Sequence, residues 1–215
     1  MTDLQTKFRE DLQEEAIEGA WNLYTDGSSR VVNGKRITGY AIVEGGGLEL
    51  ESGPLPPGMS AQTAELFAEK RALEVAKGKS VNIWTDSKYA CGVVHVFGKI
   101  WSERGLLTSQ GKNLAHHNLV LETLEALSLP TQVAIIHLAG HQKGNAPEVV
   151  GNRLADELAR RAAEMEIGSE RMAALIPVAK EVTAPYKYTQ KELELAEQQG
   201  ATMVDGVLVM KDERG

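Results

Sequence analysis

Two apolar segments that each end in an aspartate constrain this chain more than any other feature. Residues 21–25 lead into Asp26 and residues 81–85 lead into Asp86, and small polar residues follow both aspartates. This is the pattern of a buried strand that carries an acid at its carboxyl end, the edge where α/β sheets usually hold their chemistry. The sequence therefore predicts an α/β fold with carboxylates gathered at one edge of a sheet.

Two further acids, Glu65 and Asp156, lie in alanine-rich segments that are typical of helices. If all four carboxylates converge, they repel one another strongly unless divalent cations neutralise them. The sequence thus suggests a metal-dependent site.

Length and composition favour one soluble domain with extensions. The chain has 215 residues, a single cysteine (Cys91) and a charged N-terminus without an apolar signal segment. One cysteine cannot form an internal disulfide and suits a reducing compartment, and no apolar run is long enough to span a bilayer. We expect a cytoplasmic or nuclear protein, or one packaged with such contents, that is not secreted and has no membrane partner.

The net charge of −7 does not exclude a nucleic-acid partner, because the excess acid lies in the flanks. Residues 1–20 contain 2 basic and 6 acidic side chains, and residues 166–215 contain 6 and 9. The central residues 21–165 contain 15 of each, the presumed metal ligands included. Bound magnesium makes this central region net positive, which suits a polyanion.

The expected elements alternate between strands and helices. An amphipathic helix is expected over residues 2–19, strands over 20–26, 37–44 and 47–53, a chain break over 53–58, a helix from Ser60 to about Lys77, a strand over 80–85 and a helix over 87–95. Further along we expect a short helix and loop over 98–111, a helix over 112–127, a strand over 131–138, a loop over 139–144 and a helix over 147–165. This order implies a mixed sheet, with an antiparallel meander first and helical crossovers later.

The remaining residues read as a linker over 167–184 and a small module over 185–215. In that module, a short helix begins at Thr189 and a hairpin turns at Asp205-Gly206.

Five motifs occur in the order found in type 1 ribonucleases H. They are residues 24–28, 61–66, 85–90, 140–144 and 151–156. The chain most resembles the ribonuclease H domain of gammaretroviral reverse transcriptases, over about residues 21–165. The resemblance implies a ribonuclease H-like α/β fold, with a five-stranded mixed sheet flanked by helices, an N-terminal helix or linker (1–20), a ribonuclease H domain (21–166) and a small C-terminal extension. Residues 185–210 resemble the extension before the zinc-binding region of gammaretroviral integrases, which implies a piece of a retroviral polyprotein.

The same resemblance assigns roles to the acids. Asp26 bridges two Mg²⁺ ions, for which Mn²⁺ may substitute, and Asp156 completes the site of the ion that activates water. Glu65 and Asp86 complete the site of the ion that stabilises the leaving 3′ oxygen. His141 serves proton transfer or product release. The implied reaction is endonucleolytic hydrolysis of the RNA strand of RNA–DNA hybrids, leaving 5′-phosphate and 3′-hydroxyl ends.

Substrate contacts are expected at Gly27, Ser28, Gln62 and Tyr89, with RNA–DNA hybrid as the partner. Related enzymes carry a strongly basic region where residues 95–118 lie here, and this chain has fewer cations there. We therefore expect weak binding by the isolated domain and reliance on a polymerase domain of a reverse transcriptase.

Two rival functions stay open at this point. One is a catalytically silent nucleic-acid-binding module derived from a retroviral ribonuclease H, against which the presence of all the expected acids argues. The other is an exonuclease or strand-transferase of the same fold, against which Gln62 and the loop at 140–144 argue.

Overall fold

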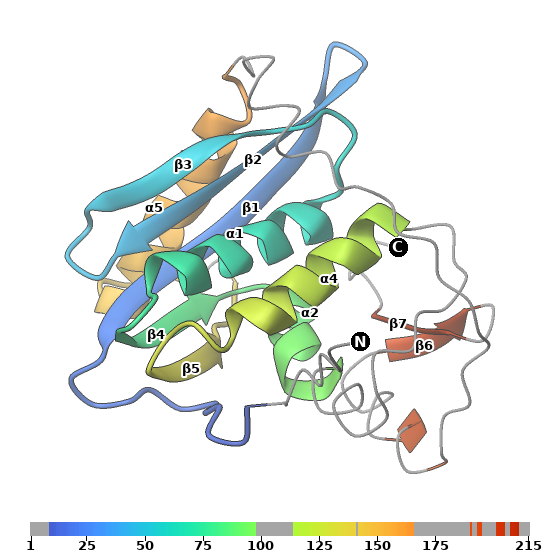
Figure 1. Ribbon diagram of the computed structural model, residues 1–215. Helices are drawn as coiled ribbons and strands as arrows, with labels where there is room; N and C mark the ends of the chain where they lie inside the picture. Colours follow the sequence, from blue (N-terminus) through green and yellow to red (C-terminus); the bar gives the residue numbers. More distant parts are fainter. Residues whose placement is uncertain are drawn as a thin grey trace.

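A computed structural model of the chain describes residues 9–97, 114–140 and 142–165, and, nearer the C-terminus, 190, 193–194, 201–204 and 207–210. Five strands form one mixed sheet in the order β3-β2-β1-β4-β5. Helices α1 and α4 cover one face of this sheet and α5 covers the other (Figure 1). This arrangement is the predicted fold class.

The first three strands form the predicted antiparallel meander: β1 (Trp21–Val32), β2 (Lys35–Glu44) and β3 (Glu49–Leu55). The prediction that the first strand ends at Asp26 was wrong, because β1 continues to Val32 and pairs with β2 along that whole length. Asn33 and Gly34 join the two strands with φ angles of 50° and 75°. Such a two-residue turn matches the twist of a hairpin, so the strands can extend beyond the sheet (Figure 1).

The chain break expected over 53–58 begins later than predicted. Gly53 and Pro54 belong to β3, where Pro54 lies opposite Gly39 of β2. Because β3 is the outer strand of the sheet, a residue without an N–H can be tolerated there.

The second half of the sheet is parallel. Strand β4 (Ser80–Thr85) pairs with β1 on one side and with β5 (Gln132–His137) on the other. Helix α1 (Ala61–Val75) precedes β4, and the Ser60 side chain caps it by accepting a hydrogen bond from the Thr63 N–H. The helix was predicted to be capped by Ser60 and to end before Gly78, and the structure agrees with both; the φ angle of Gly78 is 74°.

The other helices also lie close to their predicted positions. Helix α2 (Lys88–Gly92) follows β4 and continues as a π-helical turn, η1 (Val93–Phe97). Helices α4 (Leu114–Ala126) and α5 (Pro147–Ala162) flank β5 along the chain. The helix and loop predicted over 98–111 fall outside the described residues.

The predicted N-terminal helix was wrong over its described part, because residues 9–20 form no helix. Gln13 instead bridges Ala134 in parallel fashion on the outer side of β5. Its N–H donates to the Val133 carbonyl at 3.2 Å, and its carbonyl accepts from the Ile135 N–H at 3.1 Å. The outer edge of a sheet carries unpaired backbone groups, and pairing them outweighs the local helical pattern.

Two polar contacts of Arg9 fix the start of this N-terminal segment. The guanidinium donates to the carbonyls of Leu127 and Pro130, at 2.8 and 2.5 Å, just after α4. Residues 1–8 lie outside the described part.

Near the C-terminus, β6 (Ala201–Val204) pairs with β7 (Val207–Met210) in antiparallel register, as the predicted hairpin requires. The predicted linker over 167–184 lies outside the described residues. No helix in the described part of the chain is long and apolar enough to cross a membrane.

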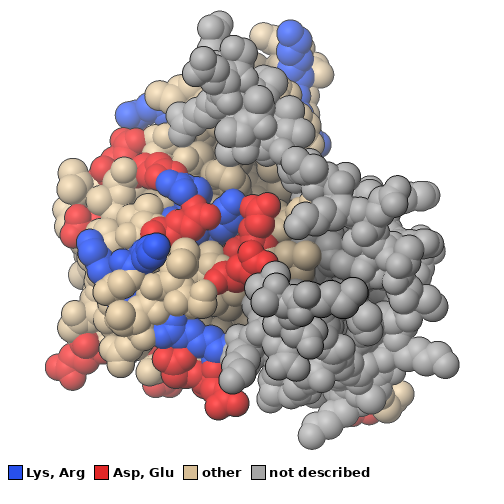
Figure 2. All heavy atoms as spheres, in the orientation of Figure 1, with Lys and Arg blue, Asp and Glu red and all other residues tan. Residues whose placement is uncertain are grey.

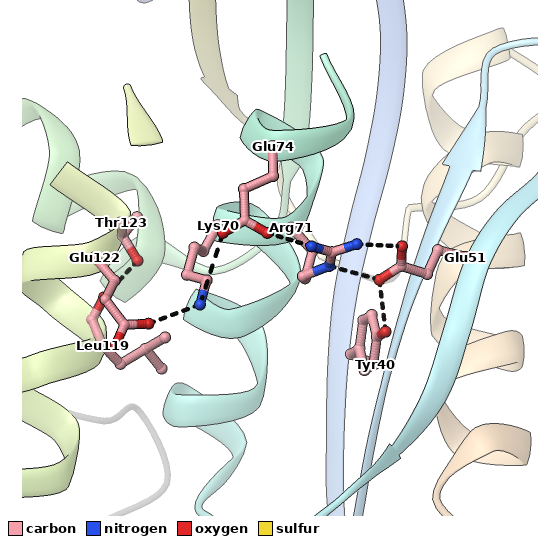
Figure 3. A network of polar contacts seen from close by, with 8 residues as sticks. All are labelled: Tyr40, Glu51, Lys70, Arg71, Glu74, Leu119, Glu122 and Thr123. Carbon is pink, nitrogen blue, oxygen red and sulfur yellow. Dashed lines mark hydrogen bonds and ion pairs between the residues drawn. The ribbon is translucent and has the colours of Figure 1, made fainter. Parts of the chain in front are cut away.

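A charged network holds α1 on the sheet (Figure 3). Arg71 donates to both carboxylate oxygens of Glu51, at 2.7 and 2.8 Å, and the Tyr40 hydroxyl donates to Glu51 Oε1 at 2.6 Å. On the other side of α1, Lys70 reaches Glu122 of α4 at 2.7 Å. Figure 2 shows acidic and basic side chains interleaved on the described part of this face, rather than gathered into one basic patch.

Candidate active site

The register between β1 and β4 brings Asp26 and Asp86 to one place. Thr25 lies opposite Thr85 in the last parallel pair, so the next residue on each chain is an aspartate. Strand β4 ends there and turns into α2, whereas β1 continues. Both acids therefore lie at the carboxyl edge of β4, as predicted.

Helix α1 brings Glu65 to the same edge because it packs tightly on β1. A Cβ added at Gly27 would lie 2.2 Å from the Glu65 nitrogen, so only glycine allows this approach. The Glu65 side chain is half-buried, and its Oε2 accepts a hydrogen bond from the Ser87 hydroxyl at 2.5 Å. Ser87 directly follows Asp86, so Glu65 reaches the turn that carries the second aspartate.

Helix α5 brings Asp156 from the opposite face. A Cβ at Gly151 would lie 2.5 Å from the Tyr24 ring, which fixes the helix against β1. Five residues on from Gly151, Asp156 forms an ion pair with Arg160 at 2.9 Å. Asn152 donates from Nδ2 to Asp86 Oδ2 at 3.3 Å, which ties α5 to the end of β4.

The charges of these acids act on one another. Asp26 is 7% exposed. Burial raises its pKa well above the ordinary value, and the negative charges of Asp86, Glu65 and Asp156 raise it further. The Gly27 N–H, which donates to Asp26 Oδ1 at 2.8 Å, opposes this rise. The three other predicted acids therefore lie within range of charge interaction with Asp26, and a nearby cation would favour ionised Asp26.

The donor set suits Mg²⁺ by its chemistry, because carboxylate oxygens are the ligands this ion prefers. Among the described residues, however, no three Asp, Glu, His or Cys side chains form a ready-made metal cluster. Three of the acids instead bond to Ser87, Asn152 and Arg160. The carboxylates are therefore neighbours held by other partners, and an arriving cation must compete with those contacts.

The predicted substrate residues have different surroundings. The Gly27 N–H is taken by Asp26, whereas Ser28 on β1 and Gln62 in the first turn of α1 are half-buried. Tyr89 is 9% exposed and packs in the main core, so its predicted contact with DNA stays a prediction. His141 lies outside the described residues, and its role also stays a prediction.

Asn152 is a site residue that the sequence motifs contained but that was not singled out. It is 8% exposed, and its Oδ1 has no hydrogen-bond partner among the described residues. Its spacing of four from Asp156 puts both side chains on one face of α5, and this signal could have identified it.

A family model described as RNase H matches residues 18–164. The chain is 45% identical over 197 residues to the Gag-Pol polyprotein of baboon endogenous virus (strain M7), which covers 90% of this chain and 11% of the polyprotein. That alignment is longer than the family match, so the similarity continues into the flanks. The chain spans between 9% and 33% of the length of the curated relatives it matches, and 9% and 11% for the Gag-Pol polyproteins of woolly monkey sarcoma virus and baboon endogenous virus.

Solved structures show the same architecture. The solution structure of the PFV RNase H domain has a TM-score of 0.56 and 28% identity, over 67% of this chain and 94% of that domain. A foamy viral protease-reverse transcriptase in complex with RNA/DNA hybrid has a TM-score of 0.55 and 25% identity, over 73% of this chain and 22% of that protein.

Proposed function

The chain belongs to the RNase H family, and from this premise we propose that it is a Mg²⁺-dependent endonuclease that hydrolyses the RNA strand of RNA–DNA hybrids. Its relatives are regions of retroviral polyproteins at 42–50% identity. The proposed products carry 5′-phosphate and 3′-hydroxyl ends, and Mn²⁺ is expected to replace Mg²⁺.

One observation carries this proposal. Asp26 is buried at the sheet edge, and three other acids lie close enough for their charges to raise its pKa. A fold gains no stability from four acids that repel one another in this way. A bound divalent cation offsets this repulsion, so the cluster supports a metal site.

Hydrogen bonds from neighbouring residues orient the acids so that they can bind metal ions. The Gly27 N–H holds one carboxylate oxygen of Asp26, which leaves the other oxygen as a ligand. The Ser87 hydroxyl orients Glu65, and the Asn152 amide orients Asp86. Asp26, Glu65, Asp86 and Asp156 are the proposed ligands of two ions. Bound Mg²⁺ supplies activation of the attacking water and neutralisation of charge on the leaving oxygen.

The proposed substrate contacts follow from the same edge. Ser28 and Gln62 flank the site on β1 and α1, and each carries groups that can bond to a ribose hydroxyl or a base edge. His141, which precedes α5 in the sequence, is the proposed proton-transfer residue. The hybrid bound to a similar foamy viral protein supports the choice of substrate.

Partners and location are proposals of the same kind. Because a similar foamy viral protein is a protease-reverse transcriptase bound to RNA/DNA hybrid, we propose that a polymerase domain also contributes to hybrid binding here. The single cysteine supports a reducing compartment, which the cytoplasm, the nucleus and a virion core offer.

The direct test is cleavage of a uniformly labelled RNA–DNA hybrid at millimolar Mg²⁺. We expect internal cuts in the RNA strand, abolished in Asp86→Asn and retained in Glu125→Gln, which changes an exposed acid on α4. Hybrid binding without any cleavage would instead support the catalytically silent module. Products released only from an end would support an exonuclease.

A further inference from the structure

A pocket of about 390 Å³ lies between the segment after β5 and the first turns of α5. Asp86 and Asp156, two acids of the candidate active site, line this pocket, and Lys143 and Arg153 also line it. Leu138 and Asn152 contribute apolar and amide surface. A pocket of this size and mixed character is typical of small-ligand sites.

The two cations of the pocket are not engaged by other charged groups of the described chain. Lys143 and Arg153 are exposed, and neither makes an ion pair or hydrogen bond with another described residue. Two other arginines of the same helix behave differently: Arg160 pairs with Asp156 at 2.9 Å and Arg161 with Glu157 at 2.8 Å. The pocket therefore offers two cations to an anion.

The amide of Asn152 gives an independent indication of a ligand. This side chain is 8% exposed and lines the pocket. Its Nδ2 donates to Asp86, but its buried Oδ1 accepts from no described residue. Buried polar atoms are nearly always paired, so a ligand hydroxyl is the kind of donor this atom lacks.

We propose that this pocket binds a nucleoside 5′-monophosphate group, the newly formed 5′ end of the cleaved RNA. Lys143 and Arg153 bind the phosphate, a ribose hydroxyl donates to Asn152 Oδ1, and the nucleoside packs against Leu138. The assignment of this group as a product end rests on the proposed function. The acids on the pocket wall oppose phosphate unless Mg²⁺ neutralises them, so binding is expected to be tightest with Mg²⁺ present.

The test is calorimetric titration of the full chain with AMP in the presence of Mg²⁺. We expect Lys143→Gln and Arg153→Gln each to weaken AMP binding about three- to tenfold, and the double variant to weaken it further. Lys77→Gln and Arg161→Gln, exposed cations outside the pocket, are the matched controls and should leave AMP binding unchanged. Adenosine and inorganic phosphate should each bind at least about tenfold more weakly than AMP.

Two results would overturn the proposal that this pocket binds a nucleotide. One is AMP affinity that needs Mg²⁺ but is the same in the Lys143 and Arg153 variants, because the phosphate is then held by the metal alone. The other is inorganic phosphate binding as tightly as AMP, which would show that no nucleoside is recognised.

Hybrid cleavage by the same preparations separates this proposal from the proposed function. If the protein cuts no hybrid but binds AMP through Lys143 and Arg153, the pocket is confirmed as a nucleotide site and its role as a product site is overturned. If the protein cuts hybrid but does not bind AMP in this way, the proposed nucleotide site is overturned and the proposed nuclease activity is not.

Discussion

Asp26 and Asp86 each directly follow the last parallel pair between β1 and β4, in which Thr25 lies opposite Thr85. The backbone register thus brings together two acids that are far apart in the sequence. Asp26 accepts a hydrogen bond from the N–H of the next residue on β1, Gly27, whereas Asp86 accepts one from Asn152 of α5.

Mg²⁺ should stabilise the folded chain through Asp26. The raised pKa of this carboxyl shows that its charge is disfavoured by burial and by three acidic neighbours. We expect Asp26→Asn to raise the melting temperature in EDTA and to abolish most of the further increase that Mg²⁺ gives the unchanged protein. Differential scanning calorimetry in EDTA and at a series of Mg²⁺ concentrations measures both effects. An equal Mg²⁺ response in the two proteins would contradict Asp26 as a ligand.

Glu69 should make the fold less stable at high pH. Its side chain is fully buried, neither carboxylate oxygen has a hydrogen-bond partner among the described residues, and burial raises its pKa well above the ordinary value. Below its unfolded-state pKa the group is neutral in both states. As pH rises toward the folded-state pKa, the unfolded chain has already released its proton and the folded chain has not, so stability falls.

Replacing Glu69 with an apolar residue tests whether stability falls as pH rises. We expect Glu69→Met to be more stable than the unchanged chain by about 1–3 kcal/mol near pH 8, with a smaller difference near pH 4. Urea denaturation at a series of pH values gives the free energy of unfolding. Glu125→Met, at an exposed position, is the control, and a pH-independent gain in Glu69→Met would argue against a buried ionisable group.

Gly151→Ala should displace α5 from the sheet. The new Cβ would lie 2.5 Å from the Tyr24 ring, where a real contact is impossible without movement. We expect a loss of about 1–3 kcal/mol in unfolding free energy, together with reduced hybrid cleavage because Asp156 moves with the helix. Gly46→Ala, where a Cβ meets nothing within 4 Å, should leave both unchanged.

Arg9→Ala should loosen the N-terminal segment from the sheet edge. The guanidinium now bonds to the carbonyls of Leu127 and Pro130. Its loss is expected to lower the free energy of unfolding by about 1–2 kcal/mol and to speed hydrogen exchange at the amides of Gln13 and Ile135. The control is Arg161→Ala, which breaks an exposed ion pair. Unchanged exchange at both amides would show that Arg9 does not hold this segment.

Much of the fold and the site was determined by the sequence alone, because the signals are local. Ser60 caps α1 through a bond to the Thr63 N–H, three residues away, and Gly78 follows the end of that helix. Apolar runs predicted the five strands of the main sheet and their order along the chain, and the order within the sheet came from the structure. The acids were recognised because each has a characteristic local setting in its own motif.

What only the tertiary structure decided involves contacts between distant residues. Residues 9–20 have a helical pattern, yet they lie along β5 because its outer edge offers unpaired backbone groups. The extension of β1 past Asp26 depends on a partner strand that runs beside it to Val32. Glu69 and Asn152 look like ordinary helical residues in the sequence. These side chains become buried, and the pocket beside Asn152 forms, only when α1 and α5 pack on opposite faces of one sheet. Burial is a property of the assembled layers and not of any single segment.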